Sequence, residues 1–346
     1  MKNNIEKALF VKLTWKIISW YLFHGRKLPW RETKDPYKIW ISEIILQQTR
    51  VTQGMQHYLN FIERFPTVED LHNASNDEVM LYWKGLGYYS RALNLHAASH
   101  QIVEEYQGEF PTSFLDLQQL KGVGKYTAAA IASICFQEKV PAIDGNFYRF
   151  FSRIFADGFD ISSPKAYSYF YELILPYVPE IEPGDFNQAI MDLGATICKP
   201  KNPECEICPV KEDCLASQIG KVDAYPVKTK KVKAQDLDLT YYLIKNKEYF
   251  LARKRGDDFI WKNLYELAPS IPDDWQDNIV SYKNIKHKLT HKNLNIDLYV
   301  VEIEDEDFHQ FAKDASYIIM TWEESHQFSF PKPLEMVLEL YSEVEN

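Results

Sequence analysis

Apolar residues recur with helical spacing from Ile5 to about Tyr177, in segments separated by glycine and proline. No stretch in this part alternates apolar and polar residues as a half-buried strand does. The predicted breaks between helices lie at glycine and proline residues: Gly25, Pro36, Pro66, the segment 108–111 and Pro141. The pattern therefore predicts an all-α first part.

The pattern changes after the last cysteine of the chain. Residues 217–238 lose apolar periodicity and contain Pro226 and the basic run Lys228–Lys233, which is typical of a solvated linker. Aromatic and β-branched runs then predict strands at 239–244, 249–253, 296–303 and 317–321, followed by an amphipathic helix at 333–341. We predict a multi-domain chain with a helical domain at 1–216, a linker at 217–238 and an α+β domain at 239–346.

Composition and charge limit the function classes. A chain of 346 residues with 46% hydrophobic composition is long enough for two domains with separate cores. Three lysines interrupt the apolar residues between Met1 and Trp15, so we expect neither a signal peptide nor a membrane span, and a cytoplasmic protein. The net charge of −10 argues against indiscriminate binding to nucleic acid but is compatible with a local basic groove.

Four of the five cysteines fall within seventeen residues, in the pattern Cys198-x6-Cys205-x2-Cys208-x5-Cys214. Thiolates at this spacing can converge on one metal centre, and a [4Fe–4S] cluster and a zinc ion are the two alternatives. We favour the cluster. The fifth cysteine, Cys135, lies in an apolar stretch and is interpreted as a buried core thiol without a role.

A glycine-rich turn precedes a predicted helix within residues 117–134. Its core is the run Gly122-Val123-Gly124-Lys125, in which the glycines allow backbone N–H groups to approach a phosphate at the helix N-terminus. Such a turn alone is weak evidence, because it is more often an ordinary loop. In this chain it is the candidate for a helix-hairpin-helix DNA contact.

Two carboxyl groups are candidates for catalysis. Glu43 is flanked by apolar residues on nearly all sides, so its pKa should be raised, which suits a general acid. Asp144 follows Gly124 by twenty residues and opens the next helical segment. An aspartate before glycine is usually only a helix cap, and for Asp144 the residues alone leave both interpretations open.

Several motifs together resemble the MutY family of adenine DNA glycosylases, over residues 24–214. They occur in the family's order: Leu28–Arg31, Ser42–Thr49, Gly85–Ala92, Gly122–Tyr126, Asp144–Asn146, Phe186–Gln188 and the four cysteines. Endonuclease III shares the hairpin, the aspartate and the cysteines, but it carries a nucleophilic lysine where this chain has Tyr126. The resemblance therefore implies a helix-hairpin-helix glycosylase with a [4Fe–4S] cluster and without strong lyase activity.

The resemblance also implies roles for individual residues. Glu43 would protonate adenine at N7, Asp144 would stabilise the sugar cation, and Tyr126 and Asn146 would orient Asp144 and the sugar side of the site. The residues that would line the adenine pocket are Arg26, Leu28, Trp30, Arg31 and Gln188. Those that would enter the duplex and touch the opposing base are Gln48, Thr49, Leu86 and Tyr88.

The second domain resembles the family's Nudix-like domain, which is similar to MutT. Leu289-Thr290-His291 stands where the family usually has Phe-Ser-His in the loop that recognises 8-oxoguanine, so the hydroxyl is kept and the aromatic ring is lost. No Nudix catalytic box is present in the sequence, and we expect no nucleotide hydrolysis. The implied partner is duplex DNA with adenine opposite 8-oxoguanine or guanine, bound by a monomer.

Three alternatives stay open at the level of sequence. The first is a bifunctional glycosylase and lyase like endonuclease III, which Tyr126 argues against. The second is a DNA-binding iron–sulfur protein that has lost its chemistry, and the third is an electron carrier. Intact Glu43 and Asp144 favour an enzyme over both.

Overall fold

The computed structural model describes residues 2–230, 234–256 and 259–345, which form two compact units. The first unit comprises Met1–Asn73 and Asn94–Lys231, and the second comprises Ala74–Leu93 and Val232–Asn346. The short segment Ala74–Leu93, with helix α5 (Asn76–Tyr82), therefore groups with the C-terminal part of the chain. None of the described helices is long and apolar enough to cross a membrane.

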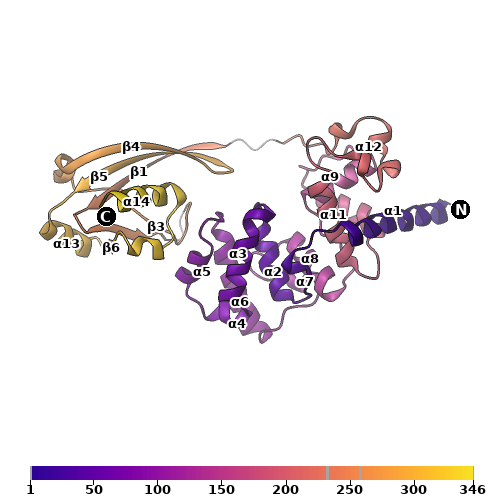
Figure 1. Cartoon of the computed structure of the whole chain (residues 1–346), viewed down its shortest axis with the longest axis horizontal. Helices are drawn as coiled ribbons and strands as arrows, with labels where there is room; N and C mark the ends of the chain where they lie inside the picture. The colour runs from indigo at the N-terminus through magenta and orange to yellow at the C-terminus, as the bar shows by residue number, and fades with distance from the viewer. Residues whose placement is uncertain (1, 231–233, 257–258, 346) are drawn as a thin grey trace. The chain divides into compact units, whose positions relative to one another are not determined.

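The regular secondary structure of the first unit, in its described residues, consists of helices alone (Figure 1). Short 3-10 turns, including η1 (Pro29–Arg31) and η2 (Leu175–Tyr177), join its helices. Its helices are α1 (Lys2–His24), α2 (Pro36–Leu46), α3 (Val51–Arg64), α4 (Val68–Asn73), α6 (Ser90–Tyr106, whose first residues belong to the second unit), α7 (Phe114–Leu117), α8 (Lys125–Phe136), α9 (Gly145–Ile154), α10 (Ala166–Ile174), α11 (Pro183–Thr196) and α12 (Leu215–Gln218). This confirms the all-α prediction for the first part.

One core joins α1, α9, α10 and α11 to the cysteine-rich loop. Its buried side chains are mostly aromatic and aliphatic, and Cys198, Cys208 and Cys214 pack against them. The cysteine loop is therefore part of the same packed core as α9 and α11. Every residue of helix α8 from Thr127 to Ile134 is buried, and the helix packs on α2. Four of these eight residues are alanines, whose small side chains allow the two helices to approach closely.

The second unit is built on a mixed six-stranded sheet. The strand order is β3-β2-β1-β5-β4, with β6 pairing β2, and β1 and β5 run parallel while the other pairs are antiparallel. The strands are β1 (Gln235–Lys245), β2 (Tyr249–Lys254), β3 (Tyr265–Glu266), β4 (Ile279–Lys288), β5 (Lys292–Glu302) and β6 (Ile318–Thr321).

Each face of this sheet is covered by one helix (Figure 1). Helix α14 (Lys332–Glu345) packs through Leu334 and Val337 on the face that includes Leu243, whereas α13 (Asp305–Asp314) packs on the opposite face, which includes Ile244. Neighbouring residues of β1 thus serve different cores, as the period of two in a strand requires. The predicted α+β architecture is confirmed.

The sequence prediction differs from the structure in several elements. It contained neither the short strand β3 nor helix α13. Strand β4 was not predicted, because nearly all its side chains are exposed and the run has no apolar face. Strand β1 begins at Gln235, within the residues predicted to be linker. Cys135 is partly exposed and does not lie in the core, although burial still raises the pKa of its thiol to about 12.

Candidate active site and iron–sulfur loop

The first unit contains a cavity of about 590 Å³ that is lined by the predicted catalytic and pocket residues. It is lined by parts of α2, α8, α9 and α11, by the start of α3 with the turn before it, and by the segment that follows α1. The lining residues are Arg26, Leu28, Trp30, Arg31, Ile39, Glu43, Leu46, Thr49, Arg50, Val51, Thr52, Tyr126, Ile134, Asp144, Asn146, Gln188, Met191 and Ala195. Every residue predicted for catalysis or for the adenine pocket is among them.

Glu43 reaches this cavity from a helix that is buried on all sides. Asp35 caps α2 by accepting a hydrogen bond from Tyr37 N, Pro36 occupies the first turn, and every residue from Ile39 to Ile45 is buried. Burial raises the pKa of Glu43 to about 7, against the lowering effects of the Tyr126 hydroxyl and the Arg31 charge. Glu43 is thus a carboxyl group that can hold its proton near neutral pH.

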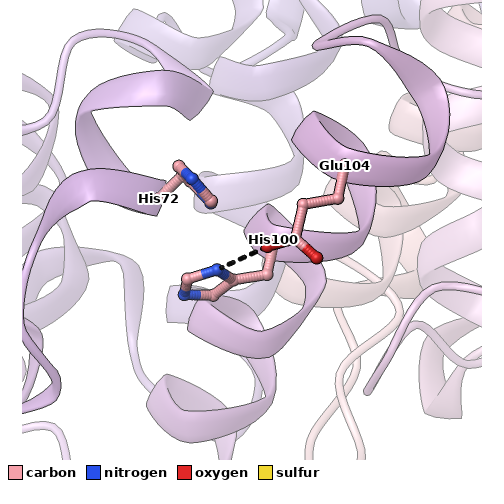
Figure 2. Close-up of side chains that lie close together, drawn as sticks. All are labelled: His72, His100 and Glu104. Atoms are coloured by element: carbon pink, nitrogen blue, oxygen red, sulfur yellow. Dashed lines mark hydrogen bonds and ion pairs between the residues drawn. The ribbon is translucent and has the colours of Figure 1, made fainter.

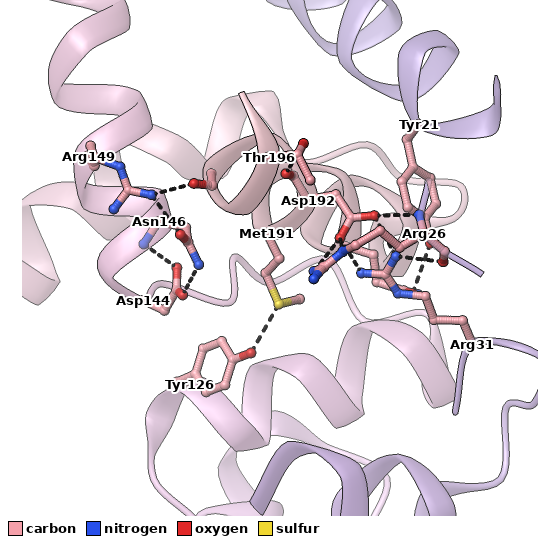
Figure 3. A network of polar contacts seen from close by, with 12 residues as sticks. Tyr21, Arg26, Arg31, Tyr126, Asp144, Asn146, Arg149, Met191, Asp192 and Thr196 are labelled. Carbon is pink, nitrogen blue, oxygen red and sulfur yellow. Dashed lines mark hydrogen bonds and ion pairs between the residues drawn. The ribbon is translucent and has the colours of Figure 1, made fainter. Parts of the chain in front are cut away.

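Asp144 is the N-cap of α9, and its carboxylate is fully engaged (Figure 3). Its Oδ1 accepts hydrogen bonds from the backbone N–H groups of Asn146 at 2.8 Å and Phe147 at 2.9 Å, and its Oδ2 accepts one from Asn146 Nδ2 at 2.6 Å. Burial raises the pKa of Asp144 above its ordinary value, and these three hydrogen bonds oppose the rise. Burial therefore raises the pKa of both carboxyl groups of the cavity. The two differ in their hydrogen bonds, because Asp144 accepts three that favour its ionised form.

Arg149 connects the support of Asp144 to the cysteine loop. Its Nη2 donates to Asn146 Oδ1 and to the carbonyl of Gly194, both at 2.8 Å, and its Nε donates to the carbonyl of Cys198 at 2.7 Å. One turn later, Arg153 donates from Nη1 to Cys198 Sγ at 3.3 Å. Helix α9 thus carries the catalytic candidate at its start and two arginine contacts to the loop farther along.

Tyr126 lies beside Glu43 and Met191. Its hydroxyl is 3.0 Å from Met191 Sδ and also within hydrogen-bonding reach of the Glu43 carboxyl group. Burial, together with the negative charge of Glu43, raises its pKa well above the ordinary value, so the phenol stays neutral. Tyr126 was predicted to orient Asp144, but the hydrogen-bonding partners of its hydroxyl are Met191 and Glu43, on the acid side of the cavity.

Arg26 and Arg31 are fixed by a buried carboxylate that the sequence analysis did not identify. Asp192 of α11 is fully buried and accepts from Arg26 N and Nε, at 2.9 and 2.7 Å, and from both terminal nitrogens of Arg31, at 2.6 and 2.7 Å (Figure 3). Burial alone would raise the pKa of Asp192, but the two arginines hold it below its ordinary value. Asp192 therefore anchors the edge of the pocket.

The remaining predicted pocket residues form its walls. Leu28 and Trp30 are buried, and Gln188 on α11 accepts a hydrogen bond at its Oε1 from the Tyr21 hydroxyl at 3.0 Å. Gln188, Met191 and Ala195 line the cavity from one face of α11, because they are three and four residues apart in turn. Tyr21 and Met191 were also missed by sequence reasoning, since neither stands in a recognisable motif.

The predicted hairpin is present between α7 and α8. Gly122 has a φ of +75°, and a Cβ at this position would lie 2.6 Å from Asn94 Cβ. Gly124 precedes α8, no side chain caps this helix, and nothing lies within 4 Å of the position of a Cβ at Gly124. The first N–H groups of α8 are therefore open to an external acceptor. Val123 is buried, and the Lys125 ammonium lies 4.3 Å from the ring centre of Tyr167.

The residues predicted to enter the duplex are arranged unequally. Gln48 and Tyr88 both adopt positive φ angles, of 58° and 47°, in turns that follow α2 and precede α6, and Thr49 lines the cavity. Tyr88 is 44% exposed, but Leu86 is only 7% exposed. The side chain of Leu86 is therefore packed inside the protein. Of these two residues, Tyr88 is the one exposed to solvent.

The predicted lesion-recognition residues form the turn between β4 and β5. The backbone N–H of Leu289 donates to the carbonyl of Lys292 at 2.8 Å, and the Leu289 side chain packs against the core of the sheet. Thr290 and His291 are exposed, and the Thr290 hydroxyl is hydrogen-bonded to the hydroxyl of Tyr88 within the second unit. Tyr88 and Thr290, predicted from separate motifs, are therefore neighbours.

The four cysteines of the loop line one small cavity. Its other walls are mainly apolar, with Phe150, Ile154, Ile197 and Val210, and Arg153 is a cationic neighbour. Four thiols that converge on one space, in an apolar surrounding with a guanidinium beside the sulfur of Cys198, suit an anionic thiolate-bound cluster. The residues present fit a [4Fe–4S] cluster.

Comparison with known proteins defines the class. Residues 41–174 match the family described as HhH-GPD superfamily base excision DNA repair protein, and residues 198–214 match the iron-sulfur binding domain of endonuclease III. Among solved structures, a thermostable thymine-DNA glycosylase is 30% identical with a TM-score of 0.57, covering 63% of this chain and all of that one. The chain is a helix-hairpin-helix DNA glycosylase, and its cofactor is a [4Fe–4S] cluster.

Relatives in sequence give the family within this class. An adenine DNA glycosylase of Buchnera aphidicola (Schizaphis graminum) is 35% identical, covering 94% of this chain and 97% of the relative. The human adenine DNA glycosylase is 43% identical, covering 58% of this chain and 39% of the relative. The chain belongs to the adenine DNA glycosylase family, as the motifs indicated.

Proposed function

We propose that the cavity excises adenine from a mispair with 8-oxoguanine or guanine in duplex DNA, as a monofunctional glycosylase acting as a monomer. The observation that carries the proposal is the pairing in one cavity of Glu43, whose pKa is raised to about 7, with Asp144, whose carboxylate accepts three hydrogen bonds. Cleavage of an N-glycosidic bond needs both an acid for the base and an anion for the sugar.

The proposed reaction begins with the adenine flipped out of the duplex into the cavity. Glu43 donates its proton to N7, and the electrons of the bond between N9 and C1′ move to the base. Asp144 stabilises the positive charge that develops on the sugar ring. Water then adds to C1′ and passes its proton to a carboxylate of the site, which leaves free adenine and an abasic sugar.

The walls of the cavity support a purine as the occupant. Leu28 and Trp30 offer apolar surface to a planar base, and the Gln188 amide can form hydrogen bonds with its edge. Arg26 and Arg31, which are held by Asp192, line the same space. Asn146 positions Asp144, and Tyr126 tunes Glu43 through its hydroxyl group.

DNA is proposed to meet the chain at three places. The hairpin residues Gly122, Val123, Gly124 and Lys125 would bind the backbone phosphates through open N–H groups and a lysine. Gln48, Thr49 and Tyr88 are the proposed contacts of the opposing base, whereas the buried Leu86 would support the turn that carries Tyr88. Leu289, Thr290 and His291, in a Nudix-like domain at 239–346 joined by a linker at 217–238 to the helical domain at 1–216, would recognise 8-oxoguanine.

Cys198, Cys205, Cys208 and Cys214 are the proposed ligands of the cluster. The bound cluster would crosslink the loop through four thiolates and supply no step of the hydrolysis. Its effect on the reaction would pass through Arg149 and Arg153, which join this loop to α9.

Adenine release from four duplexes tests the proposal directly. With adenine opposite 8-oxoguanine, guanine, cytosine or thymine, we expect fast release for the first, slower release for the second and little for the others. Asp144→Asn should abolish release while duplex binding persists. Equal release from all four duplexes, or undiminished turnover by Asp144→Asn, would refute it.

Recognition of the lesion has its own test. Thr290→Val removes the hydroxyl and keeps the shape, so discrimination between 8-oxoguanine and guanine should fall by about 5- to 10-fold, the value of one hydrogen bond. Thr240→Val, at an exposed site on β1, is the matched control and should keep the discrimination.

The absence of a catalytic lysine at Tyr126 is tested by borohydride trapping. We expect little covalent adduct between protein and DNA, and Tyr126→Lys should increase the yield. Efficient trapping by the unmodified protein would instead favour the alternative of a glycosylase and lyase like endonuclease III.

A further inference from the structure

Two histidines and a glutamate meet between α4 and α6, apart from the catalytic cavity and the cysteine loop. They are His72, in the last turn of α4, and His100 and Glu104, one turn apart on α6 (Figure 2). One potential ligand atom from each of them lies within 4.8 Å of the others. None of the proposed steps of base excision uses these side chains.

The contacts inside this group leave ligand atoms facing one another. The rings of His72 and His100 meet edge to face, with centres 4.4 Å apart, and His100 Nδ1 lies 3.4 Å from Glu104 Oε1. His72 Nδ1 is buried and has no hydrogen-bond partner among the residues that the structure describes. A buried nitrogen without a partner is costly, and a ligand at this position would satisfy it.

We propose that His72, His100 and Glu104 bind one Zn²⁺ ion, or another divalent transition metal ion of similar preference. Imidazole nitrogen suits Zn²⁺ and its neighbours in the first transition row, whereas Mg²⁺ and Ca²⁺ prefer sites made of oxygen alone. Two nitrogens and one carboxylate oxygen provide three ligands, and water completes the coordination.

The positions of the three residues allow convergence on one ion. His100 and Glu104 are four residues apart and lie on the same face of α6, as two ligands on one helix must. Tetrahedral bonds of about 2.0–2.1 Å place ligand atoms about 3.3 Å apart, somewhat closer than the present arrangement. Glu104 is exposed and already lies 3.4 Å from His100 Nδ1, and changes of the side-chain torsions can bring the ligand atoms closer.

Bound metal would close a long loop of the chain. His72 precedes and His100 follows the segment 73–99, which includes Gly85, Gly87 and the exposed Tyr88. An ion held at both ends of this segment restricts the conformations that the loop can adopt, as other crosslinks do. The site would therefore stabilise the connection that carries Tyr88.

Titration of the purified holoprotein with Zn²⁺ tests the site. We expect one equivalent to bind, with affinity weakened at least tenfold by His72→Asn and by Glu104→Gln. Glu105→Gln, the neighbouring exposed residue on α6, is the matched control and should bind within twofold of the unaltered protein. The cluster absorbance should stay constant throughout the titration.

Two further measurements separate this site from adventitious binding. X-ray absorption at the zinc edge should show nitrogen and oxygen ligands at about 2.0–2.1 Å, and saturating Zn²⁺ should raise the Tm of the unaltered protein but not of Glu104→Gln. Zinc–sulfur bonds of about 2.3 Å would place the ion at the cysteines and overturn the proposal. Equal affinity of Glu104→Gln and Glu105→Gln, or no saturable binding, would overturn it as well.

Discussion

Asn146 donates a hydrogen bond of 2.6 Å from its side-chain amide to Asp144 Oδ2. The same amide accepts, through its oxygen, a hydrogen bond of 2.8 Å from Arg149. The orientation of Asn146 is therefore fixed from both sides, and its donor can point only towards the carboxylate. Asp144 is also the N-cap of α9. The backbone N–H groups at the start of this helix therefore hold the carboxylate that is proposed to stabilise the sugar cation.

Gly194 is predicted to be essential to this arrangement. A Cβ at Gly194 would lie 2.6 Å from both Cβ and Oδ1 of Asn146, so Gly194→Ala must displace the amide that holds Asp144. We expect base release to fall by about 100-fold, the effect of a misplacement of about 1 Å, at a stability cost of about 1–3 kcal/mol. Gly158→Ala, where a Cβ meets nothing within 4 Å, should change single-turnover release by less than about twofold.

The rate of base release should depend on the protonation of Glu43. Since the pKa of Glu43 is raised to about 7, the acid form predominates below this pH and declines above it. Single-turnover release should be nearly constant below pH 7 and fall about tenfold for each pH unit above it. Glu43→Gln should lower the rate of base release by about 10²- to 10⁴-fold. It should also abolish the alkaline limb of the pH profile, which is the fall in rate above pH 7. A variant that retained this limb would show that another group titrates.

The same group should make stability depend on pH. In the unfolded chain Glu43 ionises near its ordinary pKa of 4.5, whereas in the folded protein it holds its proton up to about 7. The folded state therefore loses up to about 3 kcal/mol as the pH rises through this window. Glu43→Gln carries no charge, so its advantage in denaturant unfolding should grow from near zero at pH 4.5 to about 3 kcal/mol at pH 8. A difference that did not change with pH would contradict this assignment.

Tyr126 should set the position of the alkaline limb. Its hydroxyl lowers the pKa of Glu43 by a hydrogen bond to the carboxyl group, and a carboxylate is a better acceptor than the Met191 sulfur. Tyr126→Phe should therefore raise the pKa of Glu43 and move the limb of the rate profile to higher pH. Tyr171→Phe, at a partly buried site on α10, should leave the profile in place.

Features that depend on short stretches of sequence were predictable. The helical first part, the C-terminal helix, four of the strands and the raised pKa of Glu43 follow from the spacing of apolar residues over short stretches of chain, whereas helix α13 was not predicted. Asp144 at the start of α9 follows equally from its neighbours. Strand β4 was missed because its polar side chains are exposed, and pairing with β5 rather than burial determines its conformation.

Features that depend on packing between distant residues were not predictable. Asp192 follows Arg26 by 166 residues, and only the packing of α11 against the segment after α1 brings them together. The position of Tyr126 beside Glu43 depends on the contact of α8 with α2. Likewise, no pattern along the chain relates His72 to His100, which belong to separate helices.

The hydrogen bonds of Arg149 also impose an order on the maturation of the protein. Asp144 depends on Asn146, which depends on Arg149, and this arginine finds its acceptors at Gly194 and Cys198, about fifty residues farther along the chain. During synthesis, the hydrogen bonds that hold the Asp144 carboxylate cannot all form until the start of the cysteine loop has left the ribosome and packed against α9. The chain would therefore acquire activity late, at the stage when its iron–sulfur loop is assembled.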